Sequence, residues 1–346
     1  MVALGHALEP LRRERAIRRY TTGRLRRRYP DDPEALRASG LLRAWWYYGV
    51  ELLPGVTTRG QYPPDMPMLP RVMLRRCDPA GMACLDLGTM EGVVPALLKK
   101  RRAGSVLAVD ATNHCVGKMA AVRHYHSVDF EFRRVGLMYD LHEQLAGRSF
   151  DLVNCSGLLY HVFSPLTVLA SLRALVKSGG LVIVSTNVTL DPEPVMDFNL
   201  AGRMHADGHT FWFPSVALLG YMLRYMRLVP IDCEFMPLGA WSRDGYAQLG
   251  RNTSFEKPSG YVSVACRAVD SVEMDDWMTD SVRASLEYHG LTDWRLADSQ
   301  PRSTIRYRGA AEAKDFDLEE AVRERPPVMP PAETRDSHVL MLDAAG

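Results

Sequence analysis

The chain lacks the features that would place it in or across a membrane. No apolar run in its 346 residues approaches the ~20 residues that a membrane-spanning helix needs. Its start includes a short apolar stretch, but arginine-rich sequence follows where a secretory signal would have its apolar region and cleavage site. We therefore expect a cytoplasmic protein with no membrane partner.

Paired cysteines and zinc-type clusters are also missing. The cysteines are scattered, with no CxxC pair and no cysteine–histidine spacing typical of zinc. Several lie in apolar runs, where a free thiol behaves as a small hydrophobic side chain. We predict no bound metal, and reduced, buried cysteines at Cys77, Cys84, Cys115, Cys155, Cys233 and Cys266.

The sequence has no large excess of charge of either sign. Its formal net charge is +1 at pH 7, so no overall field favours nucleic acid. The charges are nevertheless uneven, because residues 12–28 are dominated by arginine and the charges of residues 315–324 are mostly acidic. Apolar residues near helical spacing in the arginine-rich segment favour a solvated amphipathic helix. An arm that binds anions or RNA is the alternative.

Internal repeats are absent, and the middle of the chain instead alternates short apolar runs with helical patterns. This alternation is typical of βαβ units and a parallel sheet. The predicted strands cover residues 84–87, 105–109, 130–135, 150–155, 181–186, 229–236 and 261–268. The predicted helices between them cover residues 93–102, 114–124, 166–176 and 216–227. Residues 1–40, broken at Pro30 and Pro33, and residues 282–288 are also predicted to be helical.

A loop with two glycines, Gly88 and Gly92, follows the first of these strands. Glycine lets a backbone approach a ligand closely, and the next helix offers unpaired N–H groups at its positive end. This arrangement is general for nucleotide-type ligands. Acidic side chains at Asp86 and Glu91, with Thr89 between the glycines, suit a ligand that also carries positive charge.

Three further strand ends extend the predicted site. A carboxylate about 20 residues after the glycine loop accepts the two hydroxyls of a ribose. The residues after the third strand are apolar, as a sandwich around an adenine requires, and the fourth strand ends at the ligand-facing edge of the sheet. The predicted contacts at these ends are Asp110, Ala111, Leu137, Met138, Asn154 and Ser156.

The glycine loop separates two classes of cofactor. A dinucleotide-binding loop reads GxGxxG, and Met90 stands where its second glycine should be. The order of the predicted elements is that of a class I methyltransferase, whose cofactor is S-adenosyl-L-methionine. That family implies a Rossmann-like α/β fold with a seven-stranded, mostly parallel sheet and helices on both faces. It also implies that the loop faces the cationic methionine part of the cofactor. We add a helical N-terminal lead-in and a C-terminal extension to this fold.

Four segments resemble a narrower group within this family. They are residues 55–60 (GVTTRG), 157–166 (GLLYHVFSPL), 179–186 (GGLVIVST) and 211–215 (FWFPS). Over roughly residues 45–268 the chain is similar to the methyltransferases typified by the bacterial tRNA wobble-uridine carboxymethyltransferase. Those enzymes hold a carboxylated cofactor with basic residues, whereas residues 45–53 here contain no lysine. This departure from the group's pattern favours ordinary S-adenosylmethionine. Many relatives of this kind act on small molecules in specialised natural-product metabolism, and the near-neutral charge agrees with a small-molecule acceptor.

Candidate catalytic residues follow the fourth strand. Methyl transfer is an in-line displacement that an enzyme assists by positioning and, where the acceptor carries a proton, by a base. Histidine titrates near neutrality, which suits His161 to that role; a structural histidine bonded to backbone is the alternative. Tyr160 is expected to orient substrate or cofactor. The loop at 204–212 is expected to line the acceptor pocket with His209, and its spacing with His205 and Asp207 is too weak a pattern to predict a metal.

The chain divides into three predicted parts. They are a lead-in or substrate lid at 1–75, a cofactor-binding domain at 76–270 and a partly flexible C-terminal extension at 271–346. The aromatic residues at 45–47 either anchor the lead-in or wall the substrate pocket, and anchoring is favoured. We expect a small-molecule acceptor first and a nucleic acid second as partners, and the sequence leaves a homodimer open. A tRNA-modifying enzyme and a non-catalytic protein that binds S-adenosylmethionine are the alternative functions.

Overall fold

The computed structural model describes residues 29–62, 69–136, 138–200, 204, 209–237, 257–272, 280–281, 284–285, 287–288, 302–309 and 316–328. Some predictions lie outside these residues. They concern the arginine-rich segment 12–28, Leu137, His205 and Asp207. These predictions stay predictions.

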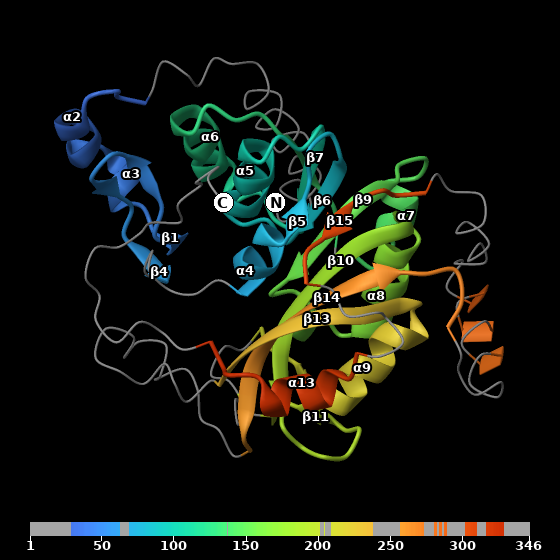
Figure 1. Ribbon diagram of the computed structural model, residues 1–346. Helices are drawn as coiled ribbons and strands as arrows, with labels where there is room; N and C mark the ends of the chain where they lie inside the picture. The colour runs from blue at the N-terminus through green and yellow to red at the C-terminus, as the bar shows by residue number, and fades with distance from the viewer. Residues whose placement is uncertain are drawn as a thin grey trace, which may run out of the picture.

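The centre of the molecule is a seven-stranded sheet with the order β13-β14-β10-β9-β6-β7-β8 (Figure 1). In chain order its strands are β6 (Ala83–Leu87), β7 (Ser105–Asp110), β8 (Glu131–Arg134), β9 (Phe150–Ser156), β10 (Val176–Thr189), β13 (Leu228–Pro237) and β14 (Ser259–Ala268). Strands β6 to β10 pair in parallel, and β14 runs antiparallel between β10 and β13. Each predicted strand overlaps one of these seven. The prediction of a mostly parallel class I sheet is confirmed.

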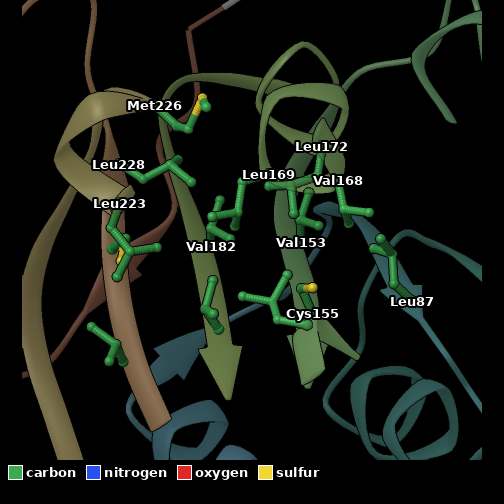
Figure 2. Packing of buried hydrophobic residues seen from close by; sticks show 14 of the residues in the cluster. Leu87, Val153, Cys155, Val168, Leu169, Leu172, Val182, Leu223, Met226 and Leu228 are labelled. Atoms are coloured by element: carbon green, nitrogen blue, oxygen red, sulfur yellow. The ribbon is translucent and has the colours of Figure 1, made fainter. Parts of the chain in front are cut away.

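Helices cover the sheet on both faces, as predicted (Figure 1). Successive side chains of a strand point to opposite faces, so Val182 and Ile183 belong to different hydrophobic clusters. Figure 2 shows part of the first cluster, where Leu169 and Leu172 lie over the strands that carry Val153 and Val182. The helices on this face are α7 (Leu141–Gln144), α8 (Pro165–Arg173), α9 (Val216–Tyr225) and α13 (Leu318–Glu324).

The second face is covered by helices and by the lead-in. Its helices are α4 (Leu69–Arg75), α5 (Val93–Lys100) and α6 (Val116–Tyr125). Trp46 is fully buried in this cluster, and its Nε1 donates to the carbonyl of Leu41 at 2.9 Å. The buried indole joins the lead-in to the domain, which is the anchoring role that we favoured for residues 45–47.

The described part of the predicted lead-in (1–75) contains strands as well as helices, so it is not helical throughout. Helices α2 (Pro33–Ala38) and α3 (Gly40–Arg43) are followed by four short strands: β1 (Trp46–Tyr48), β2 (Glu51–Leu53), β3 (Val56–Thr57) and β4 (Gly60–Tyr62). Gly55 has a φ of +70° and lets β2 turn back onto β3. Strands β1 and β4 pair in parallel. Two- and three-residue strands are too short for a period-2 pattern to reveal them.

The C-terminal extension is tied to the domain at two places. Strand β15 (Arg306–Tyr307) pairs with β5 (Cys77–Asp78), and α13 packs against α9 and β13. The described residues of 280–288 are helical, as predicted. All six cysteines are buried and unpaired, which confirms their reading as core residues. Within the described parts of the chain, no helix is long and apolar enough to span a membrane.

A further pair of strands, β11 (Met196–Phe198) and β12 (Trp212–Pro214), lies between β10 and α9 in the chain. It packs against β10 and against the short 3₁₀ helix η2 (Leu159–His161) that follows β9. This pair and η2 together stand at the carboxyl end of the parallel strands, where ligands of open α/β sheets bind.

Candidate active site

The glycine loop joins β6 to α5 with its backbone in the left-handed region. Gly88, Met90 and Gly92 have φ values of +70°, +47° and +79°. The N–H groups of Gly88 and Thr89 donate to the carbonyl of Val109 at 2.9 and 3.2 Å, which fixes the loop against β7. The structure therefore supports the need for glycine at both predicted positions.

The two glycines serve different purposes. A Cβ on Gly92 would lie 2.7 Å from Cζ of Phe130, so the packing of α5 requires glycine there. A Cβ on Gly88 would meet only Cδ1 of Leu158, at 3.9 Å. The backbone at Gly88 is thus open to the close approach of a ligand, as the sequence predicted.

Asp86 lies beneath the loop with 2% of its surface exposed. Its Oδ1 accepts a hydrogen bond from Nδ2 of Asn154 at 2.7 Å. Burial raises the pKa of Asp86 to about 7, although the bond from Asn154 opposes that shift by stabilising the ionised carboxylate. A cationic ligand beside this carboxylate would favour its charged form further.

Asp110 ends β7 and is also buried. Its Oδ2 accepts from the N–H of Met90 at 3.2 Å, and its Oδ1 accepts from the N–H and hydroxyl of Thr112 at 2.8 and 3.1 Å. A carboxylate has about four acceptor positions, so Asp110 retains capacity for a ligand hydroxyl. The carbonyl of the next residue, Ala111, accepts from Nε of Arg134 at 2.7 Å. Asp110 and Asp86 lie on either side of the glycine loop in neighbouring strands.

Glu91 has partners that the sequence did not indicate. Its Oε1 accepts from the N–H of Tyr47 at 2.7 Å and from Nζ of Lys118 at 3.3 Å, and the side chain is fully buried. Lys118 also lies 4.7 Å from the ring centre of Trp45. Glu91 therefore joins the cofactor loop to the lead-in, and its predicted contact with the cofactor stays a prediction.

Met138 lies in the first hydrophobic cluster with only 2% of its surface exposed. Its φ of +67° marks a sharp turn after β8. Its partner in the prediction, Leu137, is outside the described residues. An adenine contact at this turn stays a prediction.

A chain of hydrogen bonds runs from Asp86 across the sheet. Ser156 donates to Oδ1 of Asn154 at 2.7 Å, and the hydroxyls of Ser156 and Ser185 are 3.0 Å apart. The hydroxyls of Ser185 and Ser263 are 2.7 Å apart. Since each hydroxyl has one hydrogen and Ser156 has used its own, Ser185 donates to Ser156 and Ser263 donates to Ser185. We call these five residues, Asp86, Asn154, Ser156, Ser185 and Ser263, the polar chain; every donor in it points toward Asp86.

The two predicted catalytic histidines meet beside η2. Nδ1 of His161 lies 2.7 Å from the carbonyl oxygen of His209. A carbonyl only accepts, so this bond assigns the proton to Nδ1 and leaves the lone pair of a neutral ring on Nε2. His209 therefore contributes its backbone to the arrangement. The carbonyl of Tyr160 accepts from the N–H of Phe211 at 2.7 Å, which holds the segment before β12 on η2.

Tyr160 and a second tyrosine, Tyr261, which was not predicted from the sequence, both place their hydroxyls near Gly157. The hydroxyls of Tyr160 and Tyr261 lie 3.3 and 3.7 Å from the place that a Cβ would take on Gly157. Tyr261 comes from β14, two strands away from β9. Nothing in the sequence near Tyr261 resembles a motif, and only the pairing of β14 with β10 brings it here.

Aromatic side chains gather just after η2 and at β11 and β12. The rings of Phe163 and Phe211 are 4.4 Å apart, and those of Phe198 and Trp212 are 4.8 Å apart. Nε1 of Trp212 donates to the carbonyl of Phe163 at 3.1 Å. Phe163 keeps 66% of its surface exposed, so this group offers apolar area to a ligand or partner.

Comparisons with known proteins agree with this fold. A family model described as a methyltransferase domain matches residues 66–225. The chain is 34% identical over 114 residues to a ubiquinone biosynthesis O-methyltransferase of Xanthomonas axonopodis pv. citri, covering 32% of this chain and 45% of that protein. It is 26% identical over 195 residues to a tRNA U34 carboxymethyltransferase of Idiomarina loihiensis, covering 56% and 59%. The chain thus spans about half the length of the curated relatives it matches.

Among solved structures, the N-terminal domain of EvdMO1, determined in the presence of SAH and D-fucose, is similar to this chain. The two are 20% identical with a TM-score of 0.48, over 69% of this chain and 97% of that domain. Residues 66–225 thus match a methyltransferase domain, and the strand order of the sheet is the one expected above for a class I fold.

Proposed function

We propose that the whole chain is a methyltransferase that transfers a methyl group from S-adenosylmethionine to a small-molecule acceptor in specialised natural-product metabolism. The observation that carries the proposal is the opening at Gly88 between two buried carboxylates, Asp86 and Asp110. It lies at the carboxyl end of the parallel strands, in a segment that matches a methyltransferase domain.

The residues present fit this cofactor. Gly88 leaves room for the cofactor beside its backbone, and Asp86 offers a carboxylate to the cationic methionine part. Asp110 offers its remaining acceptor position to a ribose hydroxyl. S-adenosylmethionine would supply the methyl group bound to its sulfonium. Asn154 donates a hydrogen bond to Asp86, and Ser156 donates one to Asn154, so both are positioning residues in this proposal.

His161 is the proposed base for an acceptor that loses a proton. Its hydrogen bond to the carbonyl of His209 places the ring proton on Nδ1, and Nε2 is the nitrogen proposed to take the proton of the acceptor. Tyr160, next to it, has its hydroxyl near Gly157 and would orient the acceptor. These roles rest on the position of η2 at the end of β9.

Two features support a small molecule as the acceptor. The net charge of +1 gives no broad attraction to a polyanion. The rings of Phe163, Phe211 and Trp212 beside η2 suit the apolar body of a small organic acceptor.

Ligand binding tests the proposal directly. S-adenosylhomocysteine at 100 times its dissociation constant should stabilise the protein by about 2.7 kcal/mol, seen as a rise in Tm. Gly88→Ala should lose that rise, since its Cβ would enter the ligand's space. Gly147→Ala is the matched control, because Gly147 has a φ of +79° and nothing within 4 Å of its Cβ position. Absence of any rise with S-adenosylhomocysteine or S-adenosylmethionine in the wild type would overturn the proposal.

Turnover separates an enzyme from a binding module. The protein is incubated with isotope-labelled S-adenosylmethionine and a metabolite extract, and labelled products are sought by mass spectrometry. His161→Gln should lower the rate while leaving the Tm rise with S-adenosylhomocysteine intact. Full binding without any labelled product would favour a non-catalytic S-adenosylmethionine-binding protein instead.

A tRNA-modifying activity is the second candidate. It is favoured by the similarity to the tRNA U34 carboxymethyltransferase of Idiomarina loihiensis over 56% of this chain. Contacts with phosphates make such binding strongly dependent on salt. Micromolar binding of the full chain to labelled bulk tRNA, weakened steeply between 50 and 200 mM salt as roughly expected for several phosphate contacts, would support it over a small-molecule acceptor.

A further inference from the structure

Asn187 is a buried amide near the carboxyl end of β10 that no part of the proposed mechanism uses. Only 5% of its surface is exposed. Its side chain makes no hydrogen bond with any described residue, although most buried side-chain amides have partners. A ligand that made hydrogen bonds to this amide would therefore gain affinity from doing so.

The neighbours of Asn187 place it beside the proposed active site. On β10 and β14, Asn187 pairs with Tyr261, and Ser185, two residues before Asn187, pairs with Ser263. Residues two apart on a strand share a face, so Asn187 and Tyr261 lie on the face that carries the polar chain. Side chains directly opposite each other in an antiparallel pair have Cβ atoms about 5 Å apart.

Tyr261 connects this pair to the cofactor loop. Its hydroxyl reaches across β10 to within 3.7 Å of the Cβ position of Gly157, which follows β9. The next residue, Leu158, is the one side chain that a Cβ on Gly88 would meet. Asn187, on β10, thus lies between the strand that carries Tyr261 and the end of β9. Leu158, just after the end of β9, connects this place to the loop at Gly88.

From this juxtaposition we infer that Asn187 and Tyr261 form the polar subsite of the acceptor pocket and bind a neutral hydrogen-bonding group, such as a carboxamide, of the methyl acceptor. The inference rests on the proposed function. A side-chain amide offers two N–H donors and one carbonyl acceptor, and a phenol hydroxyl offers one of each. Such a set matches a neutral group that both donates and accepts. A carboxylate or ammonium ion would bring a full charge that neither side chain balances.

Fragment binding to the full chain saturated with S-adenosylhomocysteine tests this subsite. Benzamide, benzoate and benzylamine share size and shape and differ in charge. We expect benzamide to bind with its carboxamide on Asn187 in a crystal structure of the complex, and to bind at least tenfold more tightly than the other two by calorimetry. Benzoate or benzylamine as the preferred fragment, or no benzamide at Asn187, would overturn the inference.

Variants on one strand sharpen the test. Asn187→Leu should weaken benzamide at least tenfold, and the nearly isosteric Asn187→Asp should turn the preference toward benzylamine. Thr186→Val is the matched control, because Thr186 is the adjacent buried residue on the opposite face of β10. It should bind all three fragments as the wild type does. Unchanged benzamide binding by both Asn187 variants would also overturn the inference.

S-adenosylhomocysteine binding distinguishes failure of the proposed methyltransferase function from failure of the proposed subsite. A protein that does not bind S-adenosylhomocysteine refutes the proposed function itself. A protein that binds it, but holds benzamide elsewhere or not at all, refutes only the subsite at Asn187 and Tyr261.

Discussion

At the scale of single residues, Asp86 is subject to two opposing influences. Burial raises the pKa of its carboxyl to about 7, and the amide of Asn154 stabilises the ionised form. Because the folded-state pKa is raised, the contribution of Asp86 to stability is full below the ordinary aspartate pKa of roughly 4. That contribution is lost as pH rises through about 7. A cationic cofactor needs the ionised carboxylate, so its binding is linked to release of this proton.

We therefore expect affinity for S-adenosylmethionine to increase as pH rises through about 7, by up to about tenfold per pH unit below that pKa. Asp86→Asn should bind more weakly and show no such increase. Isothermal titration calorimetry at a series of pH values measures both. A wild-type affinity that stays constant across neutrality, or one that falls with rising pH, would contradict the assignment.

At the scale of elements, Glu91 and Lys118 connect the cofactor loop, α6 and the lead-in. The carboxylate of Glu91 is fully buried, and only 13% of the Lys118 side chain is exposed. Oε2 of Glu91 has no partner among the described residues. Removing one member of a buried ion pair leaves the other charge unbalanced, whereas removing both avoids that penalty. The link between the lead-in and the loop therefore depends on the pair as a unit.

Glu91→Gln and Lys118→Met should each lower the free energy of unfolding by about 3–5 kcal/mol, and the double variant should lose less than the two together. Urea denaturation of the four proteins gives the coupling energy. Glu131→Gln is a suitable control, because Glu131 and Arg148 form an exposed pair whose loss should cost about 1 kcal/mol or less. Additive losses at Glu91 and Lys118 would refute the coupling.

The same elements explain how far the sequence predicts this molecule. Continuous apolar runs such as Phe150–Cys155 mark strands buried on both faces, and they were recognised. The glycine loop and Asp110 follow such runs directly, so their positions at the ends of β6 and β7 were predictable. Asn187 and Tyr261 were not, because they meet only through the pairing of β10 with β14, which no local pattern specifies. The partners of Glu91 were missed for the same reason, since Tyr47 is 44 residues away.

At the scale of the whole molecule, Asp232 joins distant parts of the chain. It lies on β13 with 3% of its surface exposed. Its Oδ2 accepts from the hydroxyl of Tyr307 at 2.6 Å and from Nη1 of Arg76 at 2.5 Å, and its Oδ1 accepts from Nη1 of Arg325 at 2.6 Å. Burial, and then the hydrogen bond to this carboxylate, raise the pKa of Tyr307 far above its ordinary value, so its hydroxyl stays a donor. Tyr307 and Arg325 of the C-terminal extension thus supply donors to a buried carboxylate of the domain.

The losses of unfolding free energy from two changes that remove these bonds to Asp232 should therefore not be additive. Asp232→Leu in the full chain leaves Arg76 and Arg325 without their shared carboxylate, and we expect it to lower the free energy of unfolding by about 3–5 kcal/mol. A chain ending at residue 301 loses Tyr307 and Arg325. Of the three side-chain donors to Asp232 it keeps only Arg76, beside the backbone N–H of Cys233, so it should also be destabilised. In that shortened chain Asp232→Leu should cost markedly less than in the full one, because two of the three side-chain donors are already gone. Urea denaturation of the four proteins tests this, and an equal cost of Asp232→Leu in both backgrounds would mean that Asp232 does not hold the extension.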